Sequence, residues 1–195
     1  MSEKISLKIV LLGNSGVGKT SLVNRWINGS HNKTITPTVG ANHQKKTLVI
    51  DGQQLDLFIW DTAGQEQFLA LAPLYTRSAS VAIMTASIVD EDSFSNLNTW
   101  KKLLEESCES FPPVILAVNK IDLSTDSMPT RDEIEESNID SYSSVFFVSA
   151  QTGEGVDELF IQAGRLGLSF HNNGQCVSNN TVTPKLERKE IDYCC

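Results

Sequence analysis

No stretch of this sequence approaches the length of a membrane span. Its runs of consecutive apolar residues, such as Ile9–Leu12, are far shorter than the roughly 20 residues that a membrane-crossing helix needs. The first residues, Met1–Lys4, lead directly into a strand-like stretch, without the apolar segment of a secretory signal. We therefore expect a chain that is made in the cytosol and stays there.

Basic residues and cysteines are also few. The chain has 16 Lys and Arg against 24 Asp and Glu, a formal net charge of −8. A protein that binds nucleic acid needs a basic face for the phosphate backbone, so we expect no nucleic-acid partner. The four cysteines match no zinc-site spacing, and structural disulfides are rare in the cytosol. Cys108 is expected to be a packing residue at the end of a helical pattern, whereas Cys194 and Cys195 need another explanation.

The composition, 40% hydrophobic and 21% charged over 195 residues, is typical of one globular domain. Strands alternate with helical patterns, which predicts an α/β fold: a doubly wound, six-stranded, mostly parallel sheet with helices on both faces. Asp51-Gly52 predicts a hairpin and therefore one antiparallel edge strand. The expected strands are Ile5–Leu12, Lys46–Ile50, Leu55–Trp60, Ser80–Ile88, Val114–Val118 and Ser144–Val148. The expected helices are Thr20–Asn28, Asp92–Glu109, Arg131–Ser137 and Glu154–Leu168.

The periodic pattern ends at Leu168. The residues beyond it are largely polar, as in His171–Gln175, and such a composition cannot bury a core. We therefore expect a domain over residues 5–169 and a flexible tail over residues 170–195.

The segment Gly13–Thr20 matches the phosphate-loop pattern G-x-x-x-x-G-K-[ST], between an expected strand and an expected helix. Glycines allow a turn in which backbone N–H groups point at phosphate oxygens, and the positive end of the helix adds to the field. Lys19 supplies a charge for the β- and γ-phosphates, and the Thr20 hydroxyl can ligate Mg²⁺. The alternative is a glycine-rich turn beside a lysine, but the strand–loop–helix context favours phosphate binding. The expected nucleotide-binding residues here are Asn14, Ser15, Gly16, Val17, Gly18, Lys19, Thr20 and Ser21.

The tetrapeptide Asn119-Lys120-Ile121-Asp122 favours guanine over adenine. Asp122 can accept hydrogen bonds from the ring N–H and the amine of guanine, and a buried Asp122 would be left unpaired by adenine. Asn119 can tie this loop to the phosphate loop, and Lys120 can lay its stem along the base. Taken alone, the tetrapeptide could be a helix cap, but its place at the carboxyl end of a strand favours ligand binding. The last expected strand is followed by Ser149, Ala150 and Gln151. A backbone N–H and a hydroxyl in this segment could reach the base carbonyl.

Four further residues indicate how the γ-phosphate is sensed. Asp61 can hold Mg²⁺ through water, because hard cations prefer oxygen ligands and keep several waters. Gly64 allows its backbone N–H to approach the γ-phosphate, and Gln65 can orient an attacking water. Thr38 is the candidate for a second Mg²⁺ hydroxyl. Thr20, Thr38 and Asp61 are therefore the expected metal residues, and Gln65 the expected catalytic residue.

These five motifs resemble those of the Ras superfamily of small GTPases, whose fold is the P-loop NTPase G domain. The segment Trp60–Glu66, the loop lengths and the terminal Cys194-Cys195 are most similar to the Rab branch. The resemblance implies a GTP/GDP switch with Mg²⁺ as cofactor, which binds and slowly hydrolyses GTP and regulates vesicle trafficking. It also implies geranylgeranylation of both terminal cysteines.

The resemblance further implies a set of partners for a monomeric chain. These are a guanine nucleotide exchange factor, a GTPase-activating protein, effectors that bind the switch loops, the prenylation machinery and a lipid-binding dissociation inhibitor. The expected location is the cytoplasmic face of an intracellular membrane, with cycling through the cytosol. A single lipid chain gives only marginal anchoring, and the tail has no polybasic patch, so two lipids are favoured.

The chain also departs from the usual Rab pattern at five positions. His31 stands where an aromatic residue, commonly Phe, stacks on guanine, and a histidine there stacks more weakly and introduces a titratable group. The other departures are His43 for Phe, Ser87 for an acidic residue, Gln151 for Lys and Leu69 for a basic residue. The phosphate and base chemistry stays whole.

Two other functions share part of this pattern. A non-hydrolysing GTP-binding scaffold would have the same fold, but the intact Gln65 and Thr38 favour hydrolysis. A P-loop nucleotide kinase would share the phosphate loop but not Asn119 to Asp122.

Overall fold

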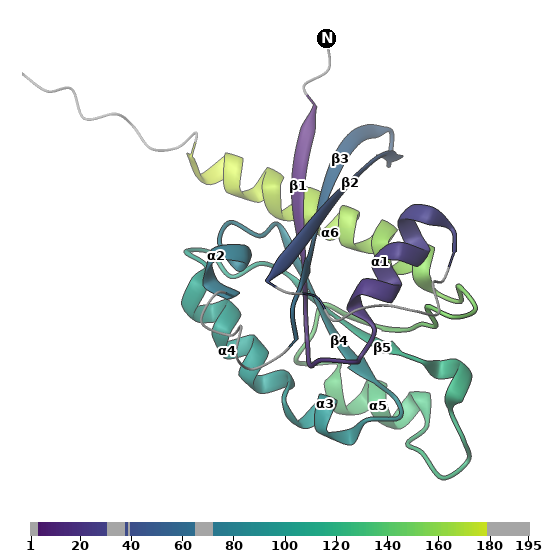
Figure 1. The fold of residues 1–195 in the computed structure, drawn as a ribbon. Coiled ribbons are helices and arrows are strands. Elements are labelled where there is room, and N and C mark those ends of the chain that lie inside the picture. Colours follow the sequence, from purple (N-terminus) through teal and green to yellow (C-terminus); the bar gives the residue numbers. More distant parts are fainter. Residues whose placement is uncertain (1–3, 31–37, 39, 65–71, 179–195) are drawn as a thin grey trace, which may run out of the picture.

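The computed structural model describes residues 4–30, 38, 40–64 and 72–178, without the side chains of residue 72 and of residues 175–178. Its centre is a six-stranded sheet in the order β2-β3-β1-β4-β5-β6 (Figure 1). The pairing of β2 with β3 is antiparallel and the remaining pairs are parallel, as the sequence predicts. The strands are β1 (Ile5–Leu12), β2 (Ala41–Ile50), β3 (Gln53–Thr62), β4 (Val81–Ser87), β5 (Val114–Asn119) and β6 (Ser144–Phe147).

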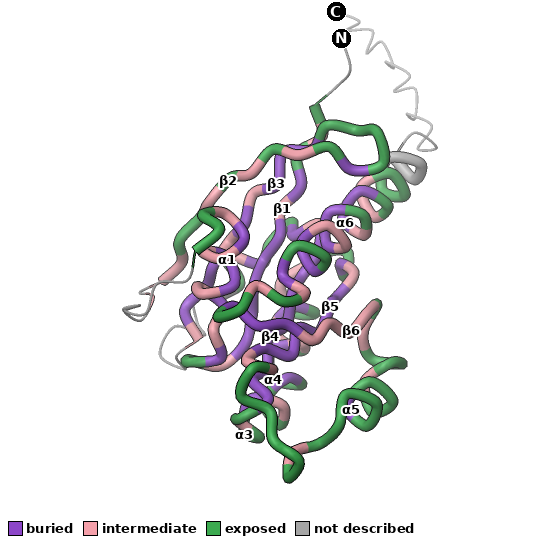
Figure 2. Tube along the Cα trace, turned by 90° about the vertical axis from the view of Figure 1, so that its right-hand side faces the viewer, coloured by how far each residue is buried: buried purple, intermediate pink, exposed green. Residues whose placement is uncertain are grey.

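Helices pack on both faces of this sheet. One core cluster joins alternate residues of the strands to Leu22 and Trp26 of α1 and to Phe160 of α6, and the other joins the opposite strand faces to Trp100 of α4 and Ile134 of α5. Figure 2 shows the central strands β1, β4 and β5 largely buried between these layers, with α5 largely exposed. The helical elements are α1 (Lys19–Asn28), α2 (Ala72–Thr76), α3 (Glu91–Ser95), α4 (Leu97–Ser107), a 3₁₀ turn η2 (Ile121–Leu123), α5 (Arg131–Asn138) and α6 (Val156–Ser178).

The hairpin is longer than the sequence indicated. Asp51 and Gly52 have φ angles of 49° and 79°, the left-handed pair of a tight hairpin turn. Pairing of β2 with β3 then continues as far as Ala41 with Thr62. The sequence pattern predicts only the second half of β2, because residues 41–45 are mostly polar and lie in an edge strand with little buried surface.

The helix expected over Asp92–Glu109 is instead two helices. In α3, the Asp90 carboxylate accepts a hydrogen bond from the Ser93 N–H, which caps the helix, and Asn96 separates α3 from α4 with φ −86° and ψ −4°. Cys108 follows α4, is half-buried and packs against the core, which confirms its expected role.

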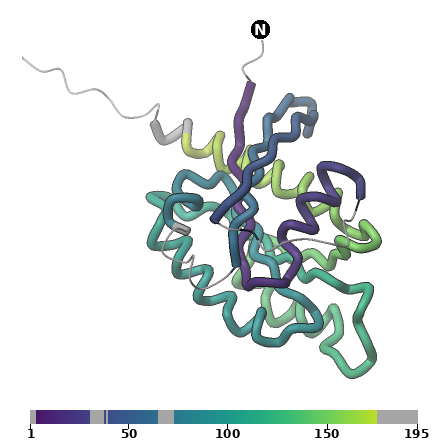
Figure 3. Tube along the Cα trace, viewed as in Figure 1, coloured from purple at the N-terminus to yellow at the C-terminus, as the bar shows by residue number. Residues whose placement is uncertain are grey.

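The expectation that the helical pattern ends at Leu168 was wrong. Helix α6 continues to Ser178, so residues 170–178 are helical rather than part of the expected tail. Once nucleated, a helix gains one hydrogen bond for each residue added, and α6 is anchored by Leu159, Phe160 and Ala163 in the core. Figure 3 shows α6 lying beside β1 although the two are far apart in the chain. Residues 179–195 lie outside the described part of the chain.

Within the described ranges, no helix combines the length and the apolar character that a membrane span requires.

Candidate nucleotide-binding site

The loops that follow β1, β3, β5 and β6 meet at one edge of the sheet, because these strands are parallel and end at the same side. The sequence motifs are located in these loops. The site therefore assembles from four separate segments of the chain, each of which follows a strand of the sheet.

The phosphate loop is held by its glycines. Gly13 has φ +138°, and a Cβ placed there would lie 2.2 Å from the carbonyl oxygen of Thr85 in β4. Gly18 has φ +100°, and its Cβ would lie 2.3 Å from Nδ2 of Asn119. Both positions thus combine a left-handed backbone with a close approach that excludes any side chain. The phosphate loop can therefore pack directly against Thr85 of β4 and against Asn119 only with glycine at positions 13 and 18.

Lys19 lies over this loop at the start of α1. Its ammonium donates hydrogen bonds to the carbonyls of Gly13, at 2.6 Å, and Asn14, at 2.7 Å. Burial lowers the pKa of Lys19 to about 8, while the charge of Asp61 acts in the opposite direction. The side chain is therefore a desolvated cation, and a phosphate anion would favour its charged form.

Three oxygen-bearing side chains meet beside Lys19. The Thr20 hydroxyl donates to Oδ2 of Asp61 at 2.7 Å and lies 3.0 Å from the Thr38 hydroxyl. Thr38 donates weakly to the same carboxylate oxygen at 3.5 Å. Oδ1 of Asp61 is buried and has no hydrogen-bond partner among the described residues. Burial raises the pKa of Asp61, partly offset by the Thr20 hydrogen bond and by Lys19.

This donor set fits Mg²⁺. Two hydroxyls and one carboxylate are hard oxygen ligands, and an unpartnered carboxylate oxygen is the group that a hydrated cation would satisfy. The structure thus brings together all three residues that the sequence indicated for metal binding, across 41 positions of the chain between Thr20 and Asp61.

Gly64 lies against the phosphate loop. A Cβ at this position would lie 2.4 Å from Nζ of Lys19 and 2.4 Å from the carbonyl carbon of Asn14. The backbone of Gly64 therefore lies beside Lys19 and Asn14, two of the residues expected to bind phosphate. Gln65 and His31 lie outside the described residues.

The two loops expected to bind the base, which carry Asn119–Asp122 and Ser149–Gln151, are joined to each other by side-chain hydrogen bonds. Asn119 donates from Nδ2 to the Val17 carbonyl at 2.8 Å, and its Oδ1 accepts from the Ala150 N–H at 3.1 Å. The Ser149 hydroxyl donates to Oδ1 of Asp122 at 2.5 Å. Asn119 thus ties the base loops to the phosphate loop, which confirms that expectation.

A cavity of about 420 Å³ opens between these loops, a size within the usual range for small-molecule sites. Asp122 is exposed and lines this cavity from the turn η2. Lys120 begins that turn with φ 66°, a strained backbone for a residue with a side chain. The cavity is lined by Gly16, Gly18, Ser21, Asn119, Lys120, Asp122, Leu123, Ala150 and Gln151.

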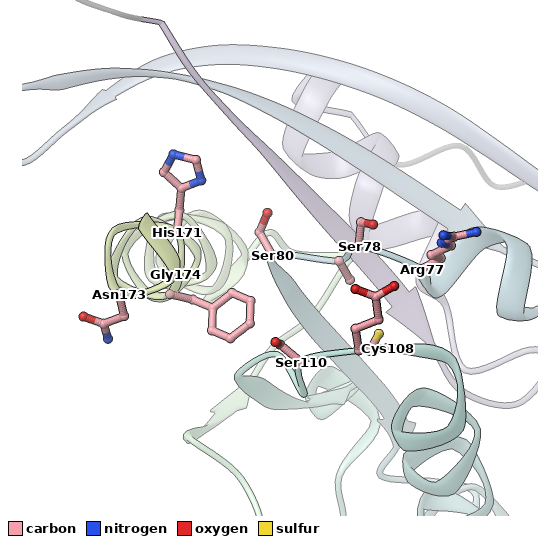
Figure 4. A pocket seen from close by; sticks show the side chains of 11 residues that line it. Arg77, Ser78, Ser80, Cys108, Ser110, His171, Asn173 and Gly174 are labelled. Atoms are coloured by element: carbon pink, nitrogen blue, oxygen red, sulfur yellow. The ribbon is translucent and has the colours of Figure 1, made fainter. Parts of the chain in front are cut away.

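A larger cavity, of about 720 Å³, lies away from these motifs. Its walls are the end of α6 around His171 and Gly174, and the loops that carry Ser78 and Ser110 (Figure 4). Ser80, which precedes β4, places this cavity at the amino ends of the strands. Burial raises the pKa of the Cys108 thiol in its wall, so that thiol is a poor nucleophile. We therefore identify the candidate site by the chemistry of its residues and not by the volume of its cavity.

The comparisons with known proteins agree with the geometry. The model of the Ras family matches residues 8–167. The chain belongs to the Ras family. It is 39% identical to the mouse Ras-related protein Rab-22A over 160 residues, which cover 82% of each chain. It is 34% identical to human Ras-related protein Rab-9A over an alignment of 202 positions that covers both chains completely. It is 31% identical to bovine Ras-related protein Rab-13 over 95% of this chain and 91% of that protein.

This Ras-family chain is a Rab-like small GTPase. It is a GTP/GDP switch that binds GTP, hydrolyses it and regulates intracellular vesicle trafficking. Nothing in the comparisons supports the alternative of a non-hydrolysing scaffold.

Two residues of this GTPase escaped prediction from the sequence. Trp100 of α4 donates from its indole N–H to Oδ1 of Asn14 at 3.0 Å, and this bond joins the phosphate loop to α4. Arg25 of α1 binds the loop after β6. The pattern of α4 places Trp100 on the apolar face, which explains its burial but not its polar contact. For Arg25 no local signal distinguishes a loop-binding residue from a solvated one.

Of the described departures from the Rab pattern, Gln151 lines the candidate cavity, whereas His43 and Ser87 are not part of its lining. His43 is exposed, with its ring centroid 5.5 Å from that of Trp60. Ser87 is buried, and its hydroxyl has no partner among the described residues. The side chain of Gln151 is exposed, while its carbonyl accepts a hydrogen bond from Arg25. Leu69 lies outside the described residues.

Proposed function

We propose that Gly13–Thr20 binds the α-, β- and γ-phosphates of GTP together with Mg²⁺. Lys19 supplies the positive charge, and the hydroxyls of Thr20 and Thr38 and the carboxylate of Asp61 hold the ion, the last through water. The buried Oδ1 of Asp61, without a partner among the described residues, is the single observation that carries this proposal. Bound Mg²⁺ would neutralise phosphate charge, while Gly64 donates its N–H to the γ-phosphate.

The guanine base would occupy the 420 Å³ cavity beside Asp122. Asp122 accepts from the ring N–H and the amine, and the stem of Lys120 lies along the base. His31 would stack on the other face. The loop with Ser149, Ala150 and Gln151 faces the base carbonyl. The network from Asn119 to Val17 supports this arrangement, because it holds the base loops at a fixed distance from the phosphate loop.

Hydrolysis would release the contacts of Thr38 and Gly64 with the γ-phosphate, and this release is the switch. We propose that no arginine of the chain acts on the γ-phosphate, so intrinsic turnover should be slow, on the order of 10⁻⁴ to 10⁻³ per second. A GTPase-activating protein would supply the missing charge. Single-turnover hydrolysis of GTP, with ATP as the competitor, tests the proposal, and equal competition by ATP would contradict it.

Changing Gln65→Leu is expected to lower the single-turnover rate of GTP hydrolysis about tenfold or more, because the side chain that orients the attacking water is lost. GTP affinity should remain near wild type, since the phosphate and base contacts are untouched. The measurement is phosphate release from preloaded protein. Gln53→Leu, a matched change in the β2–β3 hairpin, should leave the rate unchanged. Wild-type turnover in Gln65→Leu would remove Gln65 from the mechanism.

The regulators would act through the loops around Thr38 and Gly64. We propose that an exchange factor opens the site, that effectors read the GTP-bound loops, and that prenylation enzymes and a lipid-binding dissociation inhibitor handle the tail. The location that follows is the cytoplasmic face of an intracellular membrane, with return to the cytosol when the lipids are shielded.

Changing Cys194→Ser and Cys195→Ser together is expected to abolish membrane residence, because both lipid attachment sites are removed and one chain alone anchors only marginally. Each single variant should shift most of the protein to the soluble fraction. The measurement is the share of tagged protein that pellets with membranes from its own cells. Cys176→Ser provides the matched control and should pellet like wild type. Pelleting of the double variant would show that these cysteines are not the anchor.

A further inference from the structure

Arg25 lies in the last turn of α1 and binds three backbone carbonyls. Its Nε donates to the Ala150 carbonyl at 2.8 Å, Nη1 donates to the Gly29 carbonyl at 3.0 Å, and Nη2 donates to the Gln151 carbonyl. Among the described residues it takes part in no ion pair. Its charge is therefore directed at carbonyl dipoles of two loops.

Two of these contacts anchor the loop that follows β6 to α1. The loop also has bonds of its own, from the Gly153 N–H to the Ser149 carbonyl at 2.8 Å and from the Thr152 N–H to the Ser149 hydroxyl at 3.1 Å. In the described part of the chain, Arg25 makes both hydrogen bonds that join α1 to this loop. Removing Arg25 would leave the Ala150 and Gln151 carbonyls without that anchor.

Helix α1 also carries the phosphate-binding groups at its other end. Lys19 and Arg25 are six positions apart, about 9 Å along a helix axis. Helix α1 packs on the core through Leu22, Val23 and Trp26. It therefore holds Lys19, which contacts the phosphate loop, at a constant distance from Arg25, which contacts the loop after β6. A nucleotide that spans both ends requires such a fixed distance.

We propose that Arg25 is a positioning residue for base recognition: it orients the Ala150–Gln151 backbone, whose Ala150 N–H donates to Asn119, so that the Gln151 N–H meets the carbonyl oxygen at position 6 of guanine. This rests on the function proposed above for the same loop. The guanidinium is suited to the task because its planar fork binds several carbonyls at once, whereas a lysine ammonium is a mobile point charge. Arg25 does not touch the base and acts through the loop.

The test compares three nucleotides on full-length protein, by displacement of fluorescent GDP. GDP is the reference. 6-Thioguanosine diphosphate replaces the carbonyl oxygen with sulfur, a weaker acceptor, and reports on the loop with Ala150. Inosine diphosphate lacks the 2-amine and reports on Asp122. Arg25→Ala and Arg25→Lys are measured beside Arg165→Ala, a matched control that removes an exposed arginine paired with Asp51.

Wild type is expected to prefer GDP over both analogues. In Arg25→Ala and Arg25→Lys the preference over the 6-thio analogue should fall at least threefold, while the preference over inosine diphosphate stays within twofold of wild type. Arg165→Ala should match wild type throughout. If Arg25→Ala does not fold, Arg25→Lys decides the question, because it keeps the charge and most of the stem.

Two other outcomes separate the two proposals. Equal weakening of all three nucleotides in the Arg25 variants would overturn the positioning role and leave Arg25 as a purely structural residue. A wild-type protein that does not distinguish GDP from inosine diphosphate would overturn the proposed role of Asp122, whatever the Arg25 variants do.

Discussion

Asp122→Asn is expected to change the base preference of the protein from guanine to xanthine. The asparagine oxygen can still accept from the ring N–H, but its NH₂ group would face the 2-amine of guanine, so that two donors oppose each other. Xanthine has a carbonyl at that position, which accepts from the new NH₂. A site built for hydrogen bonds rejects a partner that leaves them unpaired by orders of magnitude, so GDP affinity should fall roughly 10³-fold.

The measurement is the affinity of the variant for GDP and for xanthosine diphosphate, by displacement of fluorescent nucleotide. Asp126→Asn is the matched control, because Asp126 is an exposed carboxylate four positions further along the chain, and it should retain wild-type preference. The Ser149 hydroxyl that donates to Asp122 can donate equally to the asparagine oxygen, so the loop itself should be preserved. An unchanged preference for GDP would show that Asp122 does not read the base.

Gly13→Ala is expected to destabilise the folded protein by roughly 3 kcal/mol or more. The new Cβ would lie 2.2 Å from the Thr85 carbonyl oxygen, and that atom belongs to the backbone of a central strand. Neither side can yield without breaking the pairing of β1 with β4. The left-handed φ of +138° adds strain of its own.

The control variant, Gly52→Ala, separates the effect of backbone strain from the effect of the close contact with β4. Gly52 has a comparable left-handed φ of +79°, but a Cβ there would have nothing within 4 Å. Gly52→Ala should therefore cost only about 1–2 kcal/mol. Both variants are compared with wild type by urea unfolding in saturating GDP and Mg²⁺. Equal losses in the two variants would show that backbone strain, and not the contact with β4, requires glycine at position 13.

Much of the fold was predictable because its signals are local. β1 was expected with its observed ends, and the beginning of α1 within one residue, since a buried apolar run and a glycine-rich loop lie side by side in the sequence. The ends of α6 and of β2 were not predictable. Both extend through polar residues, and their extent depends on helix propagation from a distant core and on pairing with β3.

The candidate site also has features that the sequence predicts and features that it does not. The types of residue in the motifs indicate phosphate, magnesium and guanine, because each chemistry requires a particular set of donors and acceptors. Arg25 and Trp100 could not be assigned from the sequence, since their partners lie 125 and 86 positions away and are chosen by packing alone. The exposure of Asp122 could not be predicted from the sequence either, because burial of a loop carboxylate depends on its tertiary surroundings.

The sequence by itself determined the chemistry that we propose for this GTPase: a phosphate loop, a carboxylate for guanine, three oxygen groups for Mg²⁺ and a pair of terminal cysteines. The tertiary structure decided which atoms meet. Parallel strands end at one edge of the sheet, so Thr20 and Asp61 lie 2.7 Å apart although separate in the chain. The close approach of Gly13 to β4 and the reach of Arg25 across to the base loop follow from packing, because contacts between distant segments leave no mark in local sequence.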